Sequence, residues 1–150
     1  IMKVPLLGRW LYGSGYLPLD RKNDRKAIET IIIATKRIAE DRHPIAVYPE
    51  GTRSKGPKIR DFRNGVFKIA QKAKSPIVVF VIDNAYRIKR RFPLLRTKIL
   101  LEVVDVLEYE DFKDMHTNDL GDKVHKMMED RLSLRRQEYS WLKDEKLKNK

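Results

Sequence analysis

The spacing of apolar residues predicts three helices that are apolar on one face. The first follows Asp24, a suitable N-cap, and its apolar positions return every three or four residues to about Arg42. The same spacing predicts helices over residues 62–74 and 120–136. Residues 3–12 mix apolar and basic side chains and are compatible with a short helix or with an interfacial turn.

Short apolar runs alternate with these helices and predict β-strands. Residues 77–82 are mostly β-branched and carry no charge, and residues 99–107 form a second run. Residues 44–48 predict a buried strand, and residues 16–19 predict a short strand whose proline suits a sheet edge or a strand end. This alternation predicts an α/β fold in which a layered, largely parallel sheet is flanked by helices.

The chain shows no linker and no internal repeat. We therefore expect one domain over residues 1–142, followed by a charged tail over residues 143–150. The sequence opens at Ile1 within a dense pattern of apolar and basic residues. We therefore expect further chain upstream and regard the domain as N-terminally incomplete.

Composition adds a strong positive charge. The chain has 33 Lys and Arg residues against 21 Asp and Glu residues, a net charge of +12. That excess predicts attraction to phosphate groups on nucleic acid, on an anionic membrane surface or on a small substrate. The absence of cysteine excludes disulfides, thiolate nucleophiles and cysteine-bound zinc. His43 and His116 have no partner at metal-ligand spacing, so we expect no metal site.

The most informative stretch is the polar loop over residues 49–61, which follows a predicted strand. It places a carboxylate, a glycine, hydroxyls and an arginine at the carboxyl end of that strand, where open α/β sheets bind ligands. A glycine lets the backbone turn amide groups towards an anion, and a guanidinium matches phosphate oxygens. The candidate phosphate-binding residues are Glu50, Gly51, Thr52, Arg53 and Ser54. A polar turn in which Arg53 pairs with Glu50 explains the same residues.

Residues 48–54 read Tyr-Pro-Glu-Gly-Thr-Arg-Ser, and this is the most specific of four motifs. The others are Gly-Tyr-Leu-Pro-Leu-Asp-Arg at residues 15–21, Phe-Arg-Asn-Gly at residues 62–65 and Ser-Pro-Ile-Val-Val-Phe-Val at residues 75–81. In their order along the chain, these motifs resemble those of the glycerolipid acyltransferases, the family of bacterial 1-acylglycerol-3-phosphate O-acyltransferase. The resemblance covers roughly residues 4–82.

The resemblance implies an enzyme that moves a fatty acyl group from acyl-CoA or acyl carrier protein to a hydroxyl of a glycerol-phosphate lipid. Lysophosphatidic acid is the expected acceptor, and no metal or bound cofactor is expected. In such an enzyme Arg21 and Arg53 would hold the acceptor phosphate. Glu50 and Gly51 would shape the pocket, and Arg63 is a further candidate. The resemblance also implies work at an anionic membrane surface, on the cytoplasmic face, through peripheral attachment or through an anchor in a missing N-terminal segment.

The family's catalytic block, His-x-x-x-x-Asp, has no counterpart ahead of these motifs. In that family the histidine deprotonates the glycerol hydroxyl and the aspartate orients the imidazole. No histidine precedes Gly15, so we expect the block upstream of Ile1. His125 and Asp130 repeat the spacing, but they follow the phosphate motif and would point about 140° apart on a helix. We therefore expect His125 to be a surface residue.

Two other functions stay open at this point. The protein could be a non-catalytic relative that binds lipid phosphate, or a basic nucleic-acid-binding α/β module. The sequence shows no helix-turn-helix, zinc finger or aromatic sheet motif, so we expect no nucleic-acid partner. Residues 3–16 and 87–98 interleave basic and bulky apolar side chains. Each stretch is a candidate lipid-docking segment, although core packing of the first and solvation of the second also explain them.

Overall fold

The computed structural model describes residues 7–17, 24–41, 43–88 and 96–142. The chain forms two compact units, residues 1–46 and residues 47–150. The candidate phosphate loop therefore belongs to the second unit. The expected tail over residues 143–150 lies outside the described residues.

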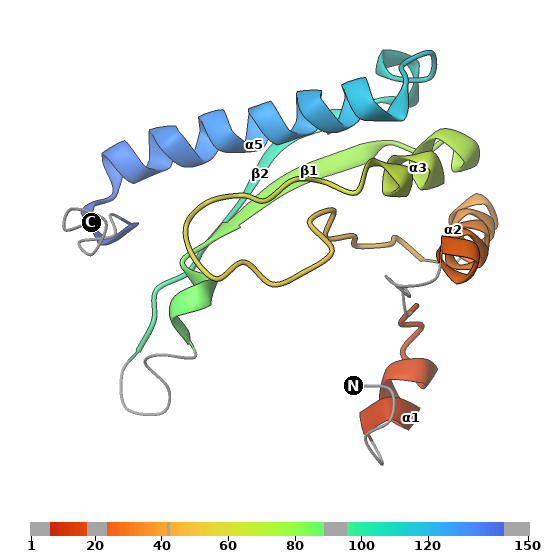
Figure 1. Cartoon of the computed structure of the whole chain (residues 1–150), viewed down its shortest axis with the longest axis horizontal. Coiled ribbons are helices and arrows are strands. Elements are labelled where there is room, and N and C mark those ends of the chain that lie inside the picture. The colour runs from red at the N-terminus through yellow and green to blue at the C-terminus, as the bar shows by residue number, and fades with distance from the viewer. Residues whose placement is uncertain (1–6, 18–23, 42, 89–95, 143–150) are drawn as a thin grey trace. The chain divides into compact units, whose positions relative to one another are not determined.

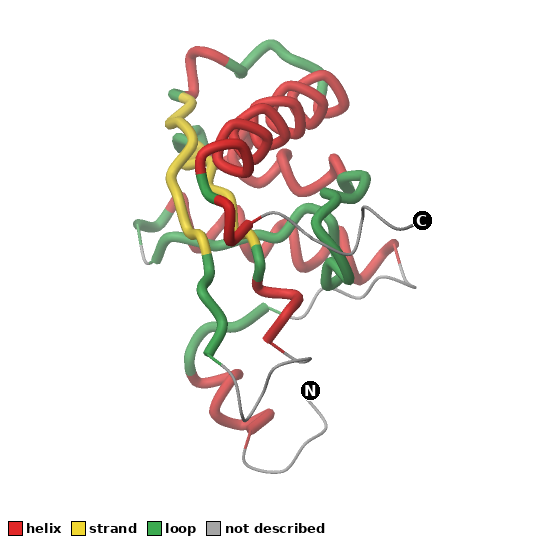
Figure 2. The backbone as a smooth tube through the Cα atoms, turned by 90° about the vertical axis from the view of Figure 1, so that its left-hand side faces the viewer, coloured by secondary structure: helices red, strands yellow, loops and turns green. Residues whose placement is uncertain are grey.

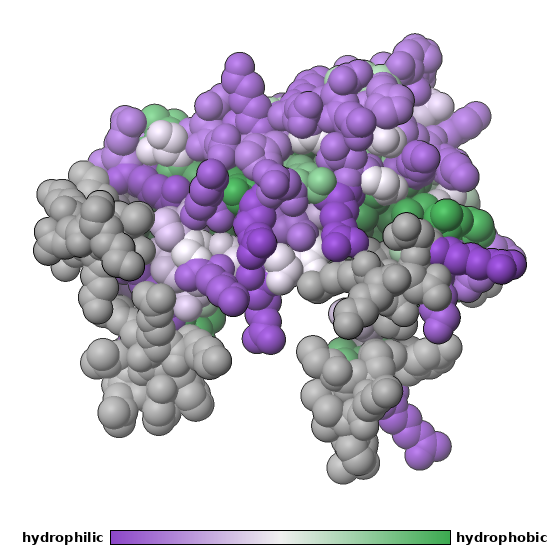
Figure 3. All heavy atoms as spheres, viewed as in Figure 1, coloured by the Kyte–Doolittle hydropathy of each residue, from purple (hydrophilic) through white to green (hydrophobic). Residues whose placement is uncertain are grey.

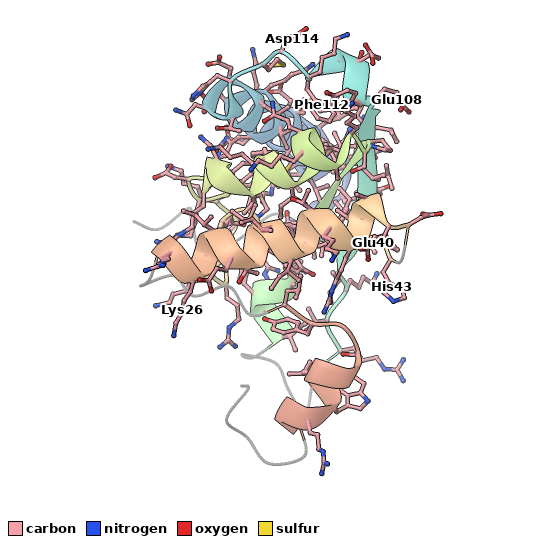
Figure 4. The ribbon with its side chains drawn as sticks, turned by 90° about the vertical axis from the view of Figure 1, so that its right-hand side faces the viewer. Lys26, Glu40, His43, Glu108, Phe112 and Asp114 are labelled. Atoms are coloured by element: carbon pink, nitrogen blue, oxygen red, sulfur yellow. The ribbon has the colours of Figure 1, made fainter. Side chains whose placement is uncertain are left out.

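The first unit contains two helices, α1 (Leu7–Gly13) and α2 (Asp24–Ala39). The long helix predicted from Asp24 is thus confirmed, and α1 overlaps the stretch that was compatible with a short helix. Lys26 and Glu40 mark the two ends of α2 in Figure 4. Arg37 Nη1 donates a hydrogen bond of 2.6 Å to the carbonyl of Gly15, which ties the turn after α1 to α2.

A two-stranded antiparallel sheet lies at the centre of the second unit. Its strands are β1 (Ile77–Asp83) and β2 (Leu100–Leu107), which confirm the two predicted strands. Ile77 lies opposite Leu107 and Asp83 lies opposite Leu100, with one irregularity in register near the middle of β1. The expected α/β class holds in the sense that helices and strands are mixed. The larger parallel sheet is not seen among the described residues, whose one sheet is antiparallel.

Helix α5 (Thr117–Glu138) packs along one face of this sheet, as Figures 1 and 2 show. It begins three residues earlier than the spacing predicts because His116 caps it. The His116 Nδ1 accepts a hydrogen bond of 3.3 Å from the Asn118 N–H, and such a cap satisfies a backbone donor at the helix start. The surface of α5 turned to the viewer in Figure 3 is mostly hydrophilic.

The predicted helix over residues 62–74 is shorter than expected. A 3₁₀ turn, η1 (Asn64–Phe67), precedes the helix α3 (Lys68–Ala73). Phe62 and Arg63 stay outside both elements. Arg63 has φ −87° and ψ 87°, which is not a helical conformation, and its N–H is bound to the carbonyl of Pro49, 2.9 Å away. The spacing of apolar residues in the sequence contains no information about such a backbone contact with a loop.

The core of the second unit lies between the sheet and α5. Phe112 is fully buried in the connection from β2 to α5, where Figure 4 labels it, and its ring meets Tyr109 edge-on with 5.9 Å between centroids. Its neighbours in the main cluster are Phe67, Val79, Leu107, Leu120 and Val124. A second buried group contains Ile59, Val81 and Leu132. Ile59 brings the end of the candidate phosphate loop into this core.

The opposite face of the sheet is apolar and largely exposed. Successive strand residues alternate between faces, so directly opposed residues share a face. Val78 is 53% exposed and Leu101 is 68% exposed. The cross-strand pairs on this face are Val78 with Val106, Phe80 with Val103 and Ile82 with Leu101.

The prediction of a buried strand over residues 44–48 is wrong. These residues have no regular secondary structure, and all except the half-buried Ile45 are exposed. A strand requires a hydrogen-bonded neighbour, and the described sheet contains β1 and β2 alone. Residues 16 and 17, from the predicted strand over residues 16–19, are also irregular, and the rest of that strand lies outside the described residues.

Candidate functional site

A tight turn opens the polar loop over residues 49–61. The Gly51 N–H donates to the carbonyl of Tyr48 over 2.9 Å, and Gly51 has a φ of +63°. A side chain is disfavoured at this backbone angle. A Cβ built on Gly51 would also lie 3.1 Å from the Cδ of Arg63. Glycine therefore serves both the turn and the close approach of the Arg63 side chain.

Glu50 holds the two arms of the loop together. Its Oε2 accepts a hydrogen bond of 3.1 Å from the backbone N–H of Arg60, and the Arg63 N–H binds the carbonyl of Pro49 nearby. The sequence left open a pair between Glu50 and Arg53, and the structure does not form it. Glu50 therefore shapes the loop, and the Arg53 guanidinium is left for another partner.

Arg53 is the cation that this arrangement presents to solvent. Its side chain is exposed and makes no hydrogen bond or ion pair within the described part of the chain. Thr52 beside it is also exposed. Ser54 is different, because its hydroxyl donates to the carbonyl of Gly56 and therefore shapes the loop. A free guanidinium next to a glycine turn can bind a phosphate through two parallel hydrogen bonds.

The structure brings five of the seven predicted residues into one short turn, Glu50 to Ser54, and places Arg63 against Gly51. Arg63 is itself exposed. Arg21, the seventh residue, lies outside the described residues. The loop thus offers two arginines, Arg53 and Arg63, at the position where the sequence predicts a phosphate.

The sequence did not reveal how the far arm of the loop is held. Arg136, in the last turn of α5, donates from Nη2 to the carbonyl of Pro57 over 2.6 Å and from Nε to Asp83 Oδ2 over 2.8 Å. A hollow of about 490 Å³ lies beside this contact, between residues 57–59 of the loop and α5. The sequence did contain one signal for this contact, because Asp83 ends an apolar strand. A buried carboxylate at such a position requires a cation or a hydrogen-bond donor as its partner.

A second ionic group joins α5 to β2. Glu102 accepts hydrogen bonds from Arg135, at 2.6 Å to both oxygens, and from Arg131 at 2.8 Å. The hydrogen bond from Arg135 holds the pKa of the Glu102 carboxyl at about 2, far below its usual value, and Arg131 acts in the same direction. Glu102 and Glu138 raise the pKa of Arg135. Where the structure describes the chain, no hydrogen bond or ion pair joins this group to the loop, so we assign it to packing of α5 on the sheet.

His125 does not form a dyad with Asp130. Its Nδ1 faces Glu129 Oε2 at 3.5 Å, and its ring meets Phe62 edge-on with 4.8 Å between centroids. Asp130 is exposed on another side of the helix. His125 keeps 25% of its side chain exposed, so the expected surface histidine is partly exposed and also packs against Phe62.

None of the described helices is both long enough and apolar enough to cross a bilayer.

Comparison with known families extends these observations. The sequence model of the family described as Acyltransferase matches residues 1–83, which include every predicted phosphate-binding residue. The chain belongs to this acyltransferase family.

Curated relatives narrow the comparison. The 1-acyl-sn-glycerol-3-phosphate acyltransferase of Haemophilus influenzae is 29% identical over 130 residues, which cover 87% of this chain and 54% of the relative. The protein of the same name from Escherichia coli is 31% identical over 112 residues, 73% of this chain and 46% of the relative. The Saccharomyces cerevisiae protein is 28% identical over 133 residues, 86% and 44% respectively. The chain spans about half the length of these relatives. No solved structure matches it.

Proposed function

We propose that this chain supplies the acceptor-binding part of an enzyme that acylates a glycerol-phosphate lipid. The acceptor is lysophosphatidic acid, and the product is phosphatidic acid for phospholipid synthesis. The donor is acyl-CoA or acyl carrier protein, and no metal or bound cofactor takes part. The relatives' shared name, which specifies a 1-acyl-sn-glycerol-3-phosphate substrate, supports this acceptor.

The observation that carries the proposal is the exposed Arg53 on a turn shaped by other residues. Glu50 accepts the Arg60 N–H and forms no ion pair with Arg53. In our proposal Arg53 and Arg21 hold the acceptor phosphate, and Arg63 and the Thr52 hydroxyl add donors. Gly51 and Ser54 keep the turn in shape. The guanidinium fork binds a phosphate dianion more strongly than a neutral headgroup because charge-assisted hydrogen bonds are the stronger ones.

The chemical step needs a base that these residues do not provide. We propose that a histidine of a His-x-x-x-x-Asp block, outside the residues of this sequence, takes the proton from the acceptor hydroxyl. The hydroxyl oxygen attacks the thioester carbonyl, the ester forms and the thiol leaves with a proton. We further propose that the block and the rest of a larger, largely parallel sheet complete the fold around the loop. The enzyme works at the cytoplasmic face of a membrane, attached peripherally or through a separate anchor.

The test is acyl transfer by the full-length protein. It is incubated with acyl-CoA and lysophosphatidic acid, in parallel with acyl carrier protein as donor and with monoacylglycerol as a phosphate-free acceptor. We expect phosphatidic acid to form, and we expect the phosphate-free acceptor to react at least tenfold less efficiently in kcat/KM. Equal use of both acceptors would remove the phosphate site from the mechanism. DNA binding without binding to anionic vesicles would instead favour the nucleic-acid module.

A further inference from the structure

Arg136 connects three segments that are far apart in the sequence. It lies in the last turn of α5, and its guanidinium reaches Asp83 at the end of β1 and the Pro57 carbonyl in the loop. Asp83 is only 5% exposed, and its second oxygen accepts the Asn84 N–H at 2.6 Å. The carboxylate is therefore fixed in place, and Arg136 extends that fixed point to the loop.

The loop is closed at its base and held at one further point. The contacts of Glu50 with Arg60 and of Pro49 with Arg63 join its first and last residues. Beyond this base, Arg136 holds the arm that contains Pro57. Arg53 lies between Glu50 and Pro57 along the chain and has no hydrogen bond or ion pair of its own within the described residues. The position of the Arg53 turn relative to β1 therefore depends on the base and on the Pro57 contact.

Two other arginines of α5 show what is particular to Arg136. Arg131 and Arg135 also reach a strand carboxylate, but that carboxylate is Glu102 on β2, and neither arginine has a hydrogen bond to the loop among the described residues. The guanidinium of Arg136 serves two acceptors at once because its donors point in different directions. A lysine donates from a single nitrogen. It would therefore reach only one of the two acceptors at a short distance, or both at longer distances.

We infer that Arg136 is a positioning residue for the acceptor-phosphate loop, an inference that rests on the proposed function. It acts through the loop backbone and does not touch the phosphate. Arg136 lies outside the residues that the family model matches, so α5 contributes to a site whose binding residues all come from the matched part. Loss of Arg136 loosens the far arm of the loop and weakens acceptor binding, while the chemical step proceeds at its normal rate once the acceptor is bound.

The first experiment measures amide hydrogen exchange by NMR in the 150-residue chain. The reporters are the hydrogen-bonded amides of Gly51, Arg60 and Arg63, which lie at the base of the loop. In Arg136→Gln we expect these amides to exchange at least fivefold faster relative to amides of β1 in the same sample. Arg131→Gln is the matched control, because it removes a strand tether from α5 without touching the loop. It should leave the ratio unchanged.

The second experiment measures kinetics in the full-length protein. We expect Arg136→Lys, which keeps the charge, to raise the KM for lysophosphatidic acid at least fivefold. The kcat should stay within twofold, and the KM for acyl-CoA should not change. A purely structural role would instead lower the amount of active enzyme and hence kcat. If Arg136→Gln fails to fold, Arg136→Lys is used for hydrogen exchange as well.

The outcomes separate the two proposals. Unchanged exchange of the loop amides in a folded Arg136 variant overturns the role of Arg136, and so does faster exchange without a change in the acceptor KM. Arg53→Ala is measured alongside. If Arg53→Ala raises the acceptor KM and Arg136→Lys does not, only the role of Arg136 fails. If neither raises it, the proposed function fails, and the positioning role fails with it.

Discussion

Replacement of Arg53 by alanine should weaken binding of the acceptor phosphate without changing the free energy of unfolding. The side chain is exposed and has no hydrogen bond or ion pair within the described residues, so its removal breaks no internal contact. Surface substitutions of this kind change the free energy of unfolding by no more than about 0.5 kcal/mol. We therefore expect the thermal unfolding curve of Arg53→Ala to match that of the parent chain.

The effect on acceptor binding should be much larger. A hydrogen bond to a charged group contributes about 1.5–3 kcal/mol. Since each 1.4 kcal/mol corresponds to a tenfold change, loss of the guanidinium should weaken phosphate binding by about 10- to 150-fold. Arg53→Lys keeps the charge without the planar fork, so it should fall between the parent chain and the alanine variant.

The assay is the dissociation constant for lysophosphatidic acid, with the KM in the full-length enzyme as a second measure. Lys72→Ala is the control, since it removes one exposed positive charge from α3, away from the loop. A change below threefold in Arg53→Ala would refute the assignment of Arg53 to the phosphate. An equal loss in Lys72→Ala would show that net charge, and not the position of the arginine, governs binding.

Three further variants test the loop and its support. Gly51→Ala should destabilise the chain by about 1–2 kcal/mol in urea unfolding, because of the positive φ at Gly51 and the approach to the Arg63 side chain, and it should weaken phosphate binding. Glu102→Gln should lower the Tm at neutral pH. Because the folded pKa of Glu102 is lowered from 4.5 to about 2, the difference should shrink as the pH falls from 4.5 and vanish near pH 2; a constant difference would contradict the ion pair. Phe112→Ala should cost about 3–5 kcal/mol by denaturant titration, and a loss under 1 kcal/mol would show that the cavity refills.

Regular elements with a strong local pattern could be predicted from the sequence. Residues 77–82 of β1 are uncharged and mostly β-branched, and α2 carries an apolar stripe after Asp24, so each element is found close to its predicted limits. Residues 44–48 are apolar in the same way, but they do not form a strand, because no described strand lies beside them to form hydrogen bonds. The helix predicted from Phe62 begins later because Arg63 adopts a non-helical backbone conformation, in which its N–H binds the Pro49 carbonyl.

The sequence supplied candidate residues for the site, whose phosphate-binding role stays a prediction, but not their contacts. Arg53 and Gly51 could be proposed because the motif and the chemistry of the residue types point to a phosphate. The partner of Glu50 could not, since it is the backbone N–H of Arg60, and every residue but proline has such a donor. The hydrogen bond from Arg136 to the Pro57 carbonyl joins residues 79 positions apart, so no pattern of residue spacing predicts it.

The pairing of β1 with β2 has a consequence for how this protein can be divided. The family match ends at Asp83, the last residue of β1, whereas the partner strand and the helix that covers both strands come later in the chain. A fragment cut at that boundary would leave Val79 and Val81 open to water on a lone strand with two bare edges, a form prone to aggregation. The limit of the family-model match is therefore not a limit of cooperative folding, and expression fragments should extend past Leu142.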